Sequence, residues 1–186
     1  MTRGIRTVRI ATRLRRNLRD FLKAHPDARI CHDHGDSRDP DVLRPTSYMG
    51  RQYGADATLS GLDIVLVRNG RASIIIEVEE SYVRPKIVLG DIFGVVLADR
   101  IRIEGEPIPV RNSLLIVALV VTDKGERARK YDRLQRHVAK FVSAINEARS
   151  PTRVNKVRIV TAPEADLVRR IERLTRLELS KELKET

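Results

Sequence analysis

Two glutamates stand where an apolar segment ends. The run ASIIIEV at 72–78 is rich in β-branched residues and predicts a buried strand, yet it carries Glu77 and leads directly into Glu79. Side chains in a strand alternate between its two faces, so Glu77 and Glu79 share one face and Val78 lies on the other. Because burying a carboxylate costs free energy, this pair is the first place to look for chemistry.

Asp63 is a third carboxylate, and the turn between two strands decides whether it joins the glutamates. The runs DIVLV and ASIIIEV flank the sequence RNGR, which predicts a β-hairpin. If Asn69-Gly70 forms a two-residue turn, Asp63 pairs with Ile76 and points away from the glutamates. If a type I turn precedes a left-handed Gly70, Asp63 pairs with Ile75 and shares their face. The sequence permits both registers.

Three carboxylates at neighbouring strand ends repel one another unless a cation lies among them. Mg²⁺ prefers hard oxygen ligands and often binds one or two carboxylates together with water and a substrate phosphate. A bound divalent ion polarises a scissile phosphate and lowers the pKa of the attacking water. The set therefore predicts phosphodiester hydrolysis, and a nearby cation, Arg84 or Lys86, is expected to stabilise the negatively charged transition state.

The same residues carry a resemblance to a family. Gly61-Leu62-Asp63, then thirteen residues, then Glu77-Val78-Glu79 resembles the Asp…(Asp/Glu)-x-Lys signature of the PD-(D/E)XK, or restriction-endonuclease-like, superfamily. The resemblance implies that Asp63, Glu77 and the backbone carbonyl of Val78 hold Mg²⁺ or Mn²⁺. It implies catalytic roles for Asp63, Glu77, Glu79 and Lys86.

Two positions depart from that signature. Leu62 stands where the family has proline, and Glu79 stands where it has the catalytic lysine. Some restriction enzymes of the superfamily use Glu-x-Glu, whereas other members place the lysine on the adjoining helix, where this chain has Lys86. Both alternatives stay open, as does an inactive protein with the same fold. An ion-pair network between these acids and Arg84 or Arg100 is the structural alternative for the cluster.

The charge of the chain indicates a polyanionic partner. Its 36 Lys+Arg exceed 25 Asp+Glu, which gives a formal charge of +11, and 28 of the basic residues are arginine. Arginine has a planar fork that suits bidentate contacts to phosphate, so nucleic acid is the expected partner. With four Tyr, three Phe and no Trp, stacking on exposed bases is disfavoured. Duplex or branched DNA is therefore expected.

The basic excess is greatest at the N-terminus. Residues 5–24 carry leucines and an isoleucine at intervals of four, which predicts an amphipathic helix with arginines on another side. We expect that helix to contact the phosphate backbone. The predicted nucleic-acid contacts are Arg6, Arg9, Arg13, Arg16, Arg51 and Arg84.

The predicted elements describe one domain, 1–186, with an α/β fold: a mixed central β-sheet flanked by helices. The N-terminal helix occupies 1–25, a long loop 32–60 and the α/β core 61–186. The family resemblance implies a restriction-endonuclease-like core. The remaining expected elements are a strand near 28–31, an apolar helix at 86–102, a parallel strand at 114–121, a helix at 126–148, a strand at 157–161 and a terminal helix after Pro163.

Several details qualify these elements. Gly90 and Gly94, four residues apart, are expected to let the apolar helix approach the sheet, and Asp91 on that helix is expected to cap or to pair with an arginine. His32-Asp33-His34, with Asp36, Asp39 and Asp41, is interpreted as turn chemistry rather than as a second metal site.

The leading hypothesis is a divalent-metal-dependent endonuclease acting on DNA, located in the cytoplasm and without a membrane partner. No apolar run approaches the ~18–20 residues of a membrane span, and the single cysteine, Cys31, excludes a cysteine-based zinc site. The family resemblance also implies a homodimer, because cleavage of both strands needs two active sites. The rival hypotheses are an inactive nucleic-acid-binding protein of the same fold and a scaffold protein whose charge only stabilises it.

Overall fold

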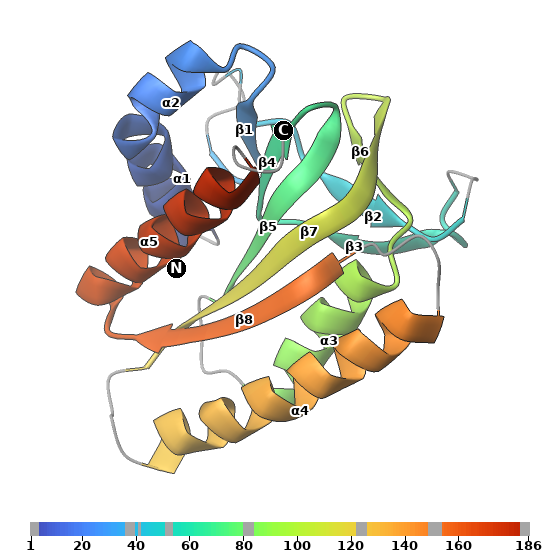
Figure 1. Cartoon of the computed structure of the whole chain (residues 1–186), viewed down its shortest axis with the longest axis vertical. Coiled ribbons are helices and arrows are strands. Elements are labelled where there is room, and N and C mark those ends of the chain that lie inside the picture. Colours follow the sequence, from blue (N-terminus) through green and yellow to red (C-terminus); the bar gives the residue numbers. More distant parts are fainter. Residues whose placement is uncertain are drawn as a thin grey trace.

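The computed structural model describes residues 4–35, 40, 42–50, 54–79, 84–121, 126–148 and 154–182. Its helices are α1 (Ile5–Asn17), α2 (Arg19–Ala24), α3 (Pro85–Val96), α4 (Glu126–Ala148) and α5 (Glu164–Glu182). Its strands are β1 (Arg29–His32), β2 (Thr46–Tyr48), β3 (Thr58–Gly61), β4 (Ile64–Arg68), β5 (Arg71–Glu79), β6 (Arg100–Ile103), β7 (Glu106–Val120) and β8 (Val154–Ala162). The α/β class is confirmed (Figure 1).

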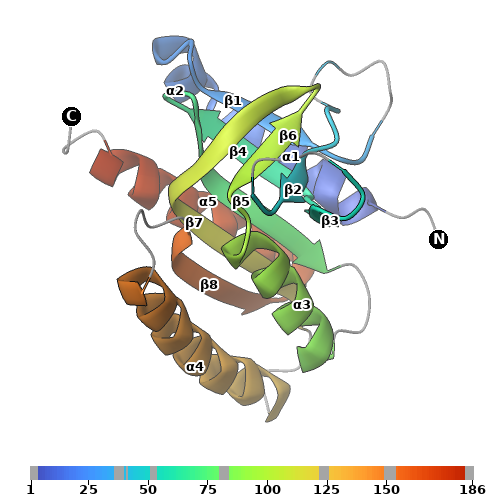
Figure 2. The ribbon, with the colours of Figure 1, turned by 90° about the vertical axis from the view of Figure 1, so that its right-hand side faces the viewer.

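Within the described residues, one mixed sheet of eight strands runs in the order β1-β4-β5-β7-β6-β2-β3, and β8 also pairs with β7. The β4–β5 hairpin is antiparallel, whereas β5, β7 and β8 are mutually parallel. The apolar run at 114–121 is therefore paired in parallel, as expected. The first part of β7 instead pairs with β6, which begins a smaller antiparallel wing with β2 and β3 (Figure 2).

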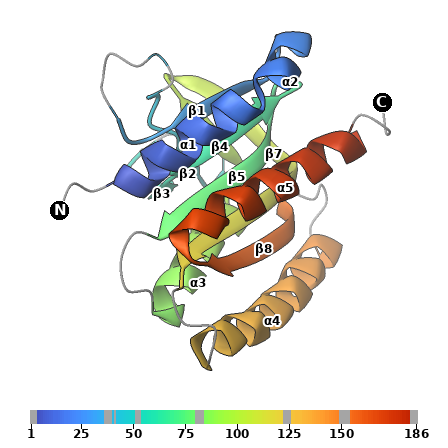
Figure 3. The same cartoon turned by 90° about the vertical axis from the view of Figure 1, so that its left-hand side faces the viewer.

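Helices cover both faces of the central sheet (Figure 3). The face covered by α3 and α4 buries Val65, Ile75 and Leu115 against Val88 and Val138. The face covered by α1, α2 and α5 buries Ile64, Ile76 and Ile116 against Ile10 and Ile171. None of the helices described is long and apolar enough to cross a membrane.

The predicted helix at 5–24 is two helices. It breaks at Leu18, whose backbone leaves the helical region while its side chain stays almost fully buried. Residues four apart advance about 40° around a helix axis at each step, so a straight helix would carry the apolar stripe away from the sheet. Beyond the break, Phe21 and Leu22 of α2 are partly buried against the same face of the sheet.

The predicted helix at 86–102 ends early, at Val96, and β6 follows at Arg100–Ile103. The tetrad RIRI alternates, with Ile101 and Ile103 buried and Arg102 exposed, so its period of two favours a strand. The predicted loop at 32–60 also contains regular structure, because β2 pairs with β6 and β3 pairs with β2. Strands of three or four residues are too short for their period to show in the sequence.

The two helix glycines differ in their surroundings. A Cβ at Gly94 would lie 2.9 Å from the Ser60 hydroxyl oxygen, and Gly94 accepts a hydrogen bond from the Ser47 hydroxyl through its carbonyl. A Cβ at Gly90 would have nothing within 4 Å. Close approach is therefore required at Gly94 alone, and the element that it approaches is the β2–β3 wing.

Candidate metal-binding acidic site

The register of the β4–β5 hairpin decides which acids meet. Asn69 and Gly70 both have positive φ, at 51° and 66°, and Arg68 lies opposite Arg71, so the turn is a two-residue turn. One strand pair further on, the register shifts. Val67 faces Ala72, but Leu66 faces Ile74, which leaves Ser73 as the extra residue of a β-bulge.

The bulge reverses the side-chain alternation of β5 beyond it. Ile64 pairs with Ile76, so continuing that register sets Asp63 opposite Glu77 on the face covered by α3 and α4. Neither register expected from the sequence is right. The turn is of the two-residue kind, and the bulge at Ser73 nevertheless brings Asp63 to the glutamate face.

Four acids make up what we call the acidic site: Asp63, Glu77, Glu79 and Asp91. Oδ2 of Asp63 accepts a hydrogen bond of 2.6 Å from the backbone N–H of Val78, which fixes the start of β4 against the end of β5. Asp91 comes from α3, which begins after the chain leaves β5. The side chain of Asp91 lies by Glu79 and raises the pKa of that carboxyl, and the expectation that Asp91 caps or pairs with an arginine stays a prediction.

Burial and mutual repulsion raise the pKa values of both glutamates. Glu77 is only 8% exposed, and its pKa is raised well above the ordinary 4.5, first by desolvation and then by the charges of Asp63 and Asp91. The pKa of Glu79 rises to about 8, first through desolvation, then through its hydrogen bond with Asp91 and the charges of Asp91 and Asp63. The strongest charges on both groups are therefore negative. This disfavours the ion-pair network with Arg84 or Arg100.

Two carboxylate oxygens of the acidic site are buried without a hydrogen-bond partner in the part of the chain described: Oε1 of Glu77 and Oδ2 of Asp91. Unpaired buried acceptors are uncommon in folded proteins and cost roughly 1–3 kcal/mol each. Structural carboxylates are normally satisfied, as Glu178 is by its ion pair of 2.6 Å with Lys156. These two oxygens therefore have acceptor capacity that no described residue uses.

The acidic site offers only oxygen donors to a divalent ion. Among the described residues, no group of three or more His, Cys, Asp or Glu side chains is placed to hold a metal ion. Mg²⁺ needs fewer protein ligands, because it usually keeps several waters and takes one or two carboxylates. Asp63, Glu77 and the carbonyl of Val78 are all oxygen donors, and Oε1 of Glu77 has its acceptor capacity unused. The residues fit a partly hydrated Mg²⁺ or Mn²⁺ bound from one side.

His34 is a neighbour of the acidic site that the sequence did not assign to it. Its Nε2 lies 3.7 Å from Oδ1 of Asp63 and 3.8 Å from Oδ2 of Asp33. The ring packs against Gly4, which starts α1 and leaves no room there for a Cβ. The first turn of α1 therefore lies beside Asp63. Of the other acids in that tract, Asp36, Asp39 and Asp41 lie outside the described residues.

The two cations predicted near the site stand at the start of α3. Arg84 precedes the first turn and is exposed, and Lys86 is exposed within that turn. Five residues separate Lys86 from Asp91, so their side chains leave the helix about 140° apart. Asp91 faces the acidic site and Lys86 emerges on another side of α3. The role of Lys86 as a substitute for the signature lysine remains a prediction.

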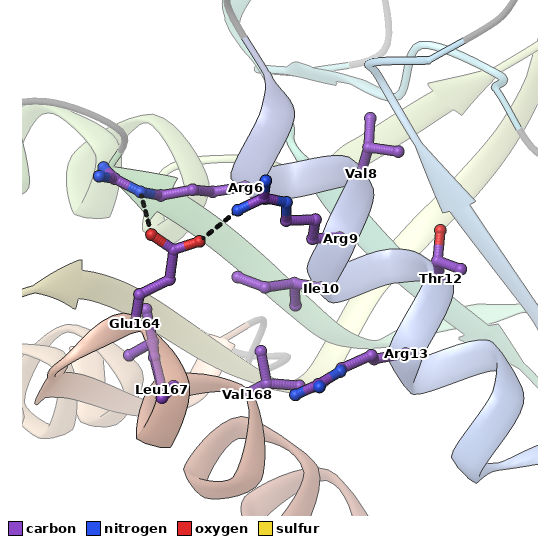
Figure 4. A pocket seen from close by; sticks show the side chains of 10 residues that line it. Arg6, Val8, Arg9, Ile10, Thr12, Arg13, Glu164, Leu167 and Val168 are labelled. Carbon is purple, nitrogen blue, oxygen red and sulfur yellow. Dashed lines mark hydrogen bonds and ion pairs between the residues drawn. The ribbon is translucent and has the colours of Figure 1, made fainter.

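Three of the predicted phosphate contacts line one groove between α1 and α5, of about 650 Å³, which we call the α1–α5 groove (Figure 4). Nε of Arg6 lies 3.4 Å from Oε2 of Glu164, and Nη1 of Arg9 lies 2.8 Å from Oε1 of the same carboxylate. These contacts lower the pKa of Glu164, with the Arg9 hydrogen bond the largest cause. The groove is lined by Arg6, Val8, Arg9, Ile10, Thr12, Arg13, Glu164, Ala165, Leu167 and Val168.

Arg16 lines a second groove, of about 540 Å³, where α1 meets α2. Its lining is Thr12, Arg15, Arg16, Arg19, Leu22 and Lys23, which includes four cations and no acid. The nucleic-acid contacts predicted from the sequence do not include Arg15, Arg19 and Lys23. Their spacing of four residues places them along one side of a helix and was the available signal. Arg51, the remaining predicted contact, lies outside the described residues.

The acidic site and the α1–α5 groove open at the same edge of the sheet. The parallel strands β5, β7 and β8 all end there, and α5 starts directly after β8. The first turn of α1 reaches this edge through the contact of Gly4 with His34. Figure 3 shows the starts of α1 and α5 beside the end of β5. A ligand that spans this edge can meet both features, although they lie on opposite faces.

Comparison of the chain with protein-family models, with curated proteins and with solved structures gives no match. The short signature around Asp63 and Glu77 therefore stands without support from a relative. The function has to be argued from the chemistry of the site.

Proposed function

We propose that the protein is a divalent-metal-dependent nuclease that hydrolyses DNA phosphodiester bonds. The observation that carries the proposal is the unpartnered, buried Oε1 of Glu77 among acids whose charges oppose its ionisation. A desolvated carboxylate without a counter-charge destabilises the fold. A bound cation removes that cost, and oxygen-only donors select Mg²⁺ or Mn²⁺.

Each acid has a distinct role in this proposal. Asp63, Glu77 and the carbonyl of Val78 would hold the ion, which when bound polarises the scissile phosphate and acidifies water. Asp63 is already oriented by the Val78 N–H. Glu79, whose metal-free pKa is about 8, would lose its proton when a cation binds beside it and would then position the attacking water. Lys86 would supply positive charge to the transition state.

Basic residues along α1 support DNA as the substrate. Arg6, Arg9 and Arg13 line the α1–α5 groove, on the opposite face of the sheet from the acidic site, and Arg16 belongs to a groove with four cations toward the other end of α1. A duplex is held chiefly through its phosphates, for which arginine is well suited. Cleavage of both strands would bring two copies of the chain together as a homodimer.

A second candidate function has its own supporting observation. Glu79 stands at the signature lysine position, and Lys86 leaves α3 on a different side from Asp91. A site without that lysine would bind nucleic acid and a cation without cutting. An inactive DNA-binding protein of the same fold is therefore the alternative.

A cleavage assay separates the two. Purified protein is incubated with supercoiled, linear, branched and single-stranded DNA in Mg²⁺, Mn²⁺ or EDTA, alongside Glu77→Gln, Asp63→Asn and the control Glu106→Gln. Glu106 is exposed and pairs with Arg29, away from the acidic site. The nuclease proposal expects cutting by the wild type and the control, and none with EDTA or with the two site variants. If the wild type binds every substrate and cuts none, the nuclease proposal fails and the binding protein replaces it.

A further inference from the structure

One carboxylate holds two of the arginines that line the α1–α5 groove. Glu164 reaches from the first turn of α5 and offers one oxygen to Arg6, at 3.4 Å, and the other to Arg9, at 2.8 Å (Figure 4). Two guanidinium groups bridged by two oxygens of one anion is also how arginines hold a phosphate group. The carboxylate of Glu164 therefore occupies the position that a phosphate would take.

The contacts to Glu164 are exchangeable. Glu164 is 43% exposed at its side chain and Arg9 is 67% exposed, so water screens the pair. Exposed ion pairs contribute little to stability, and an incoming anion can replace one partner at low cost. Arg13 lines the same groove, and its neighbour Thr12 lines both grooves, so the two grooves adjoin along α1. A phosphate that contacts both Arg6 and Arg9 meets Glu164.

We propose that Glu164 is an internal competitor for nucleic-acid phosphate in the α1–α5 groove, and that binding of a DNA backbone displaces its carboxylate from Arg6 and Arg9. The proposal deepens the proposed function and rests on it for the class of ligand. It does not require cleavage. Phosphate binding must break both contacts with Glu164, so this carboxylate lowers the affinity of the protein for DNA.

A matched control separates competition from simple charge. Asp166 lies in the same first turn of α5, and its Oδ1 pairs with Arg169 at 2.6 Å. Replacing either acid by its amide removes one negative charge and the same favourable interaction with the helix N-terminus. Only the change at Glu164 removes an ion-pair partner from arginines of the groove.

The test is a titration of a short, labelled DNA duplex, followed by fluorescence anisotropy in EDTA so that no cleavage occurs. We expect Glu164→Gln to bind about 3–10-fold more tightly than the wild type, from the loss of two exposed ion pairs that compete with phosphate. We expect Asp166→Asn to change the affinity by less than about twofold. Equal gains for both variants, or no gain or a loss for Glu164→Gln, would overturn the proposal.

A double-mutant cycle tests the stated cause. In an Arg6→Gln, Arg9→Gln background, the added Glu164→Gln change should not alter the DNA affinity, because the arginines for which carboxylate and phosphate compete are gone. Should Glu164→Gln alone fail to fold, the Arg6→Gln, Arg9→Gln protein decides: an unchanged DNA affinity overturns the proposal. A protein that binds DNA and shows this coupling but never cuts would refute only the nuclease. A cutting protein without the coupling would refute only the competitor.

Discussion

The substitution Glu77→Gln should stabilise the protein when no metal is present. Glu77 is 8% exposed, its Oε1 has no partner among the described residues, and the nearest charges are those of Asp63 and Asp91. The folded state must either keep a buried charge or hold a proton that the unfolded chain releases at neutral pH. The amide has nearly the same shape and needs neither.

The size of the effect follows from the burial. An uncompensated buried charge costs several kcal/mol, and the amide gives back about 1–3 kcal/mol because its own polar groups are poorly satisfied there. We expect a net gain of about 1–3 kcal/mol. For a chain of this length, each kcal/mol raises Tm by about 2–4 °C, so the metal-free Tm should rise by about 2–12 °C.

The assay is thermal unfolding at pH 8 in EDTA, with Glu178→Gln as the control. Glu178 is 7% exposed, nearly as buried as Glu77, but it pairs with Lys156 at 2.6 Å. Its replacement leaves the Lys156 charge without a partner and should lower Tm. The two substitutions are chemically identical, but they should change Tm in opposite directions. If Glu77→Gln lowers the metal-free Tm as Glu178→Gln does, Glu77 is an ordinary structural carboxylate and the reasoning fails.

Two further predictions concern pH and packing. The pKa of Glu79 is about 8 in the folded protein against an ordinary 4.5, so between these pH values the folded state holds a proton that the unfolded chain releases. The metal-free Tm of the wild type, measured relative to that of Glu79→Gln, should therefore fall from pH 5 to pH 8. A rise over this range would contradict the prediction. Mg²⁺ should raise Tm more at pH 8 than at pH 6, because ion and proton compete for the same oxygens; an equal rise at both pH values would count against the site. Gly94→Ala should lower the free energy of unfolding, measured in denaturant, by about 1–3 kcal/mol, because a Cβ would lie 2.9 Å from the Ser60 hydroxyl oxygen. Gly90→Ala should raise it by up to about 1 kcal/mol, because a Cβ there would meet nothing within 4 Å. Similar losses for both variants would contradict this packing.

Much of the central sheet could be predicted because its signals are local. A few consecutive residues are enough to predict each of the β-branched strands, the Asn69-Gly70 turn and the amphipathic helices. The acids at 77 and 79 were found because a period of two sets them on one face. The short strands β2, β3 and β6 were missed because their pairing with one another stabilises them, not any pattern within them.

The register that unites the acids could not be predicted, because it depends on three strands at once. The pairing shifts beside Ser73 in β5, and the pairing of β7 with both β5 and β8 shifts next to Ser113. The Ser113 hydroxyl donates to the carbonyl of Ala72, which joins the two irregular places. Such a match between distant segments leaves no local trace. The proximity of Asp91 to Glu79 left no signal in the sequence for the same reason, since only the packing of α3 brings the two together.

The most direct measurement is a titration of the protein with Mn²⁺, followed by electron paramagnetic resonance of the free ion. The account predicts a bound Mn²⁺ in the wild type and in Glu106→Gln that is lost in Glu77→Gln and Asp63→Asn. Mg²⁺ should displace it. Equal Mn²⁺ binding by the wild type and Glu77→Gln, or no binding by either, would contradict the claim that the acidic site is built for a divalent cation.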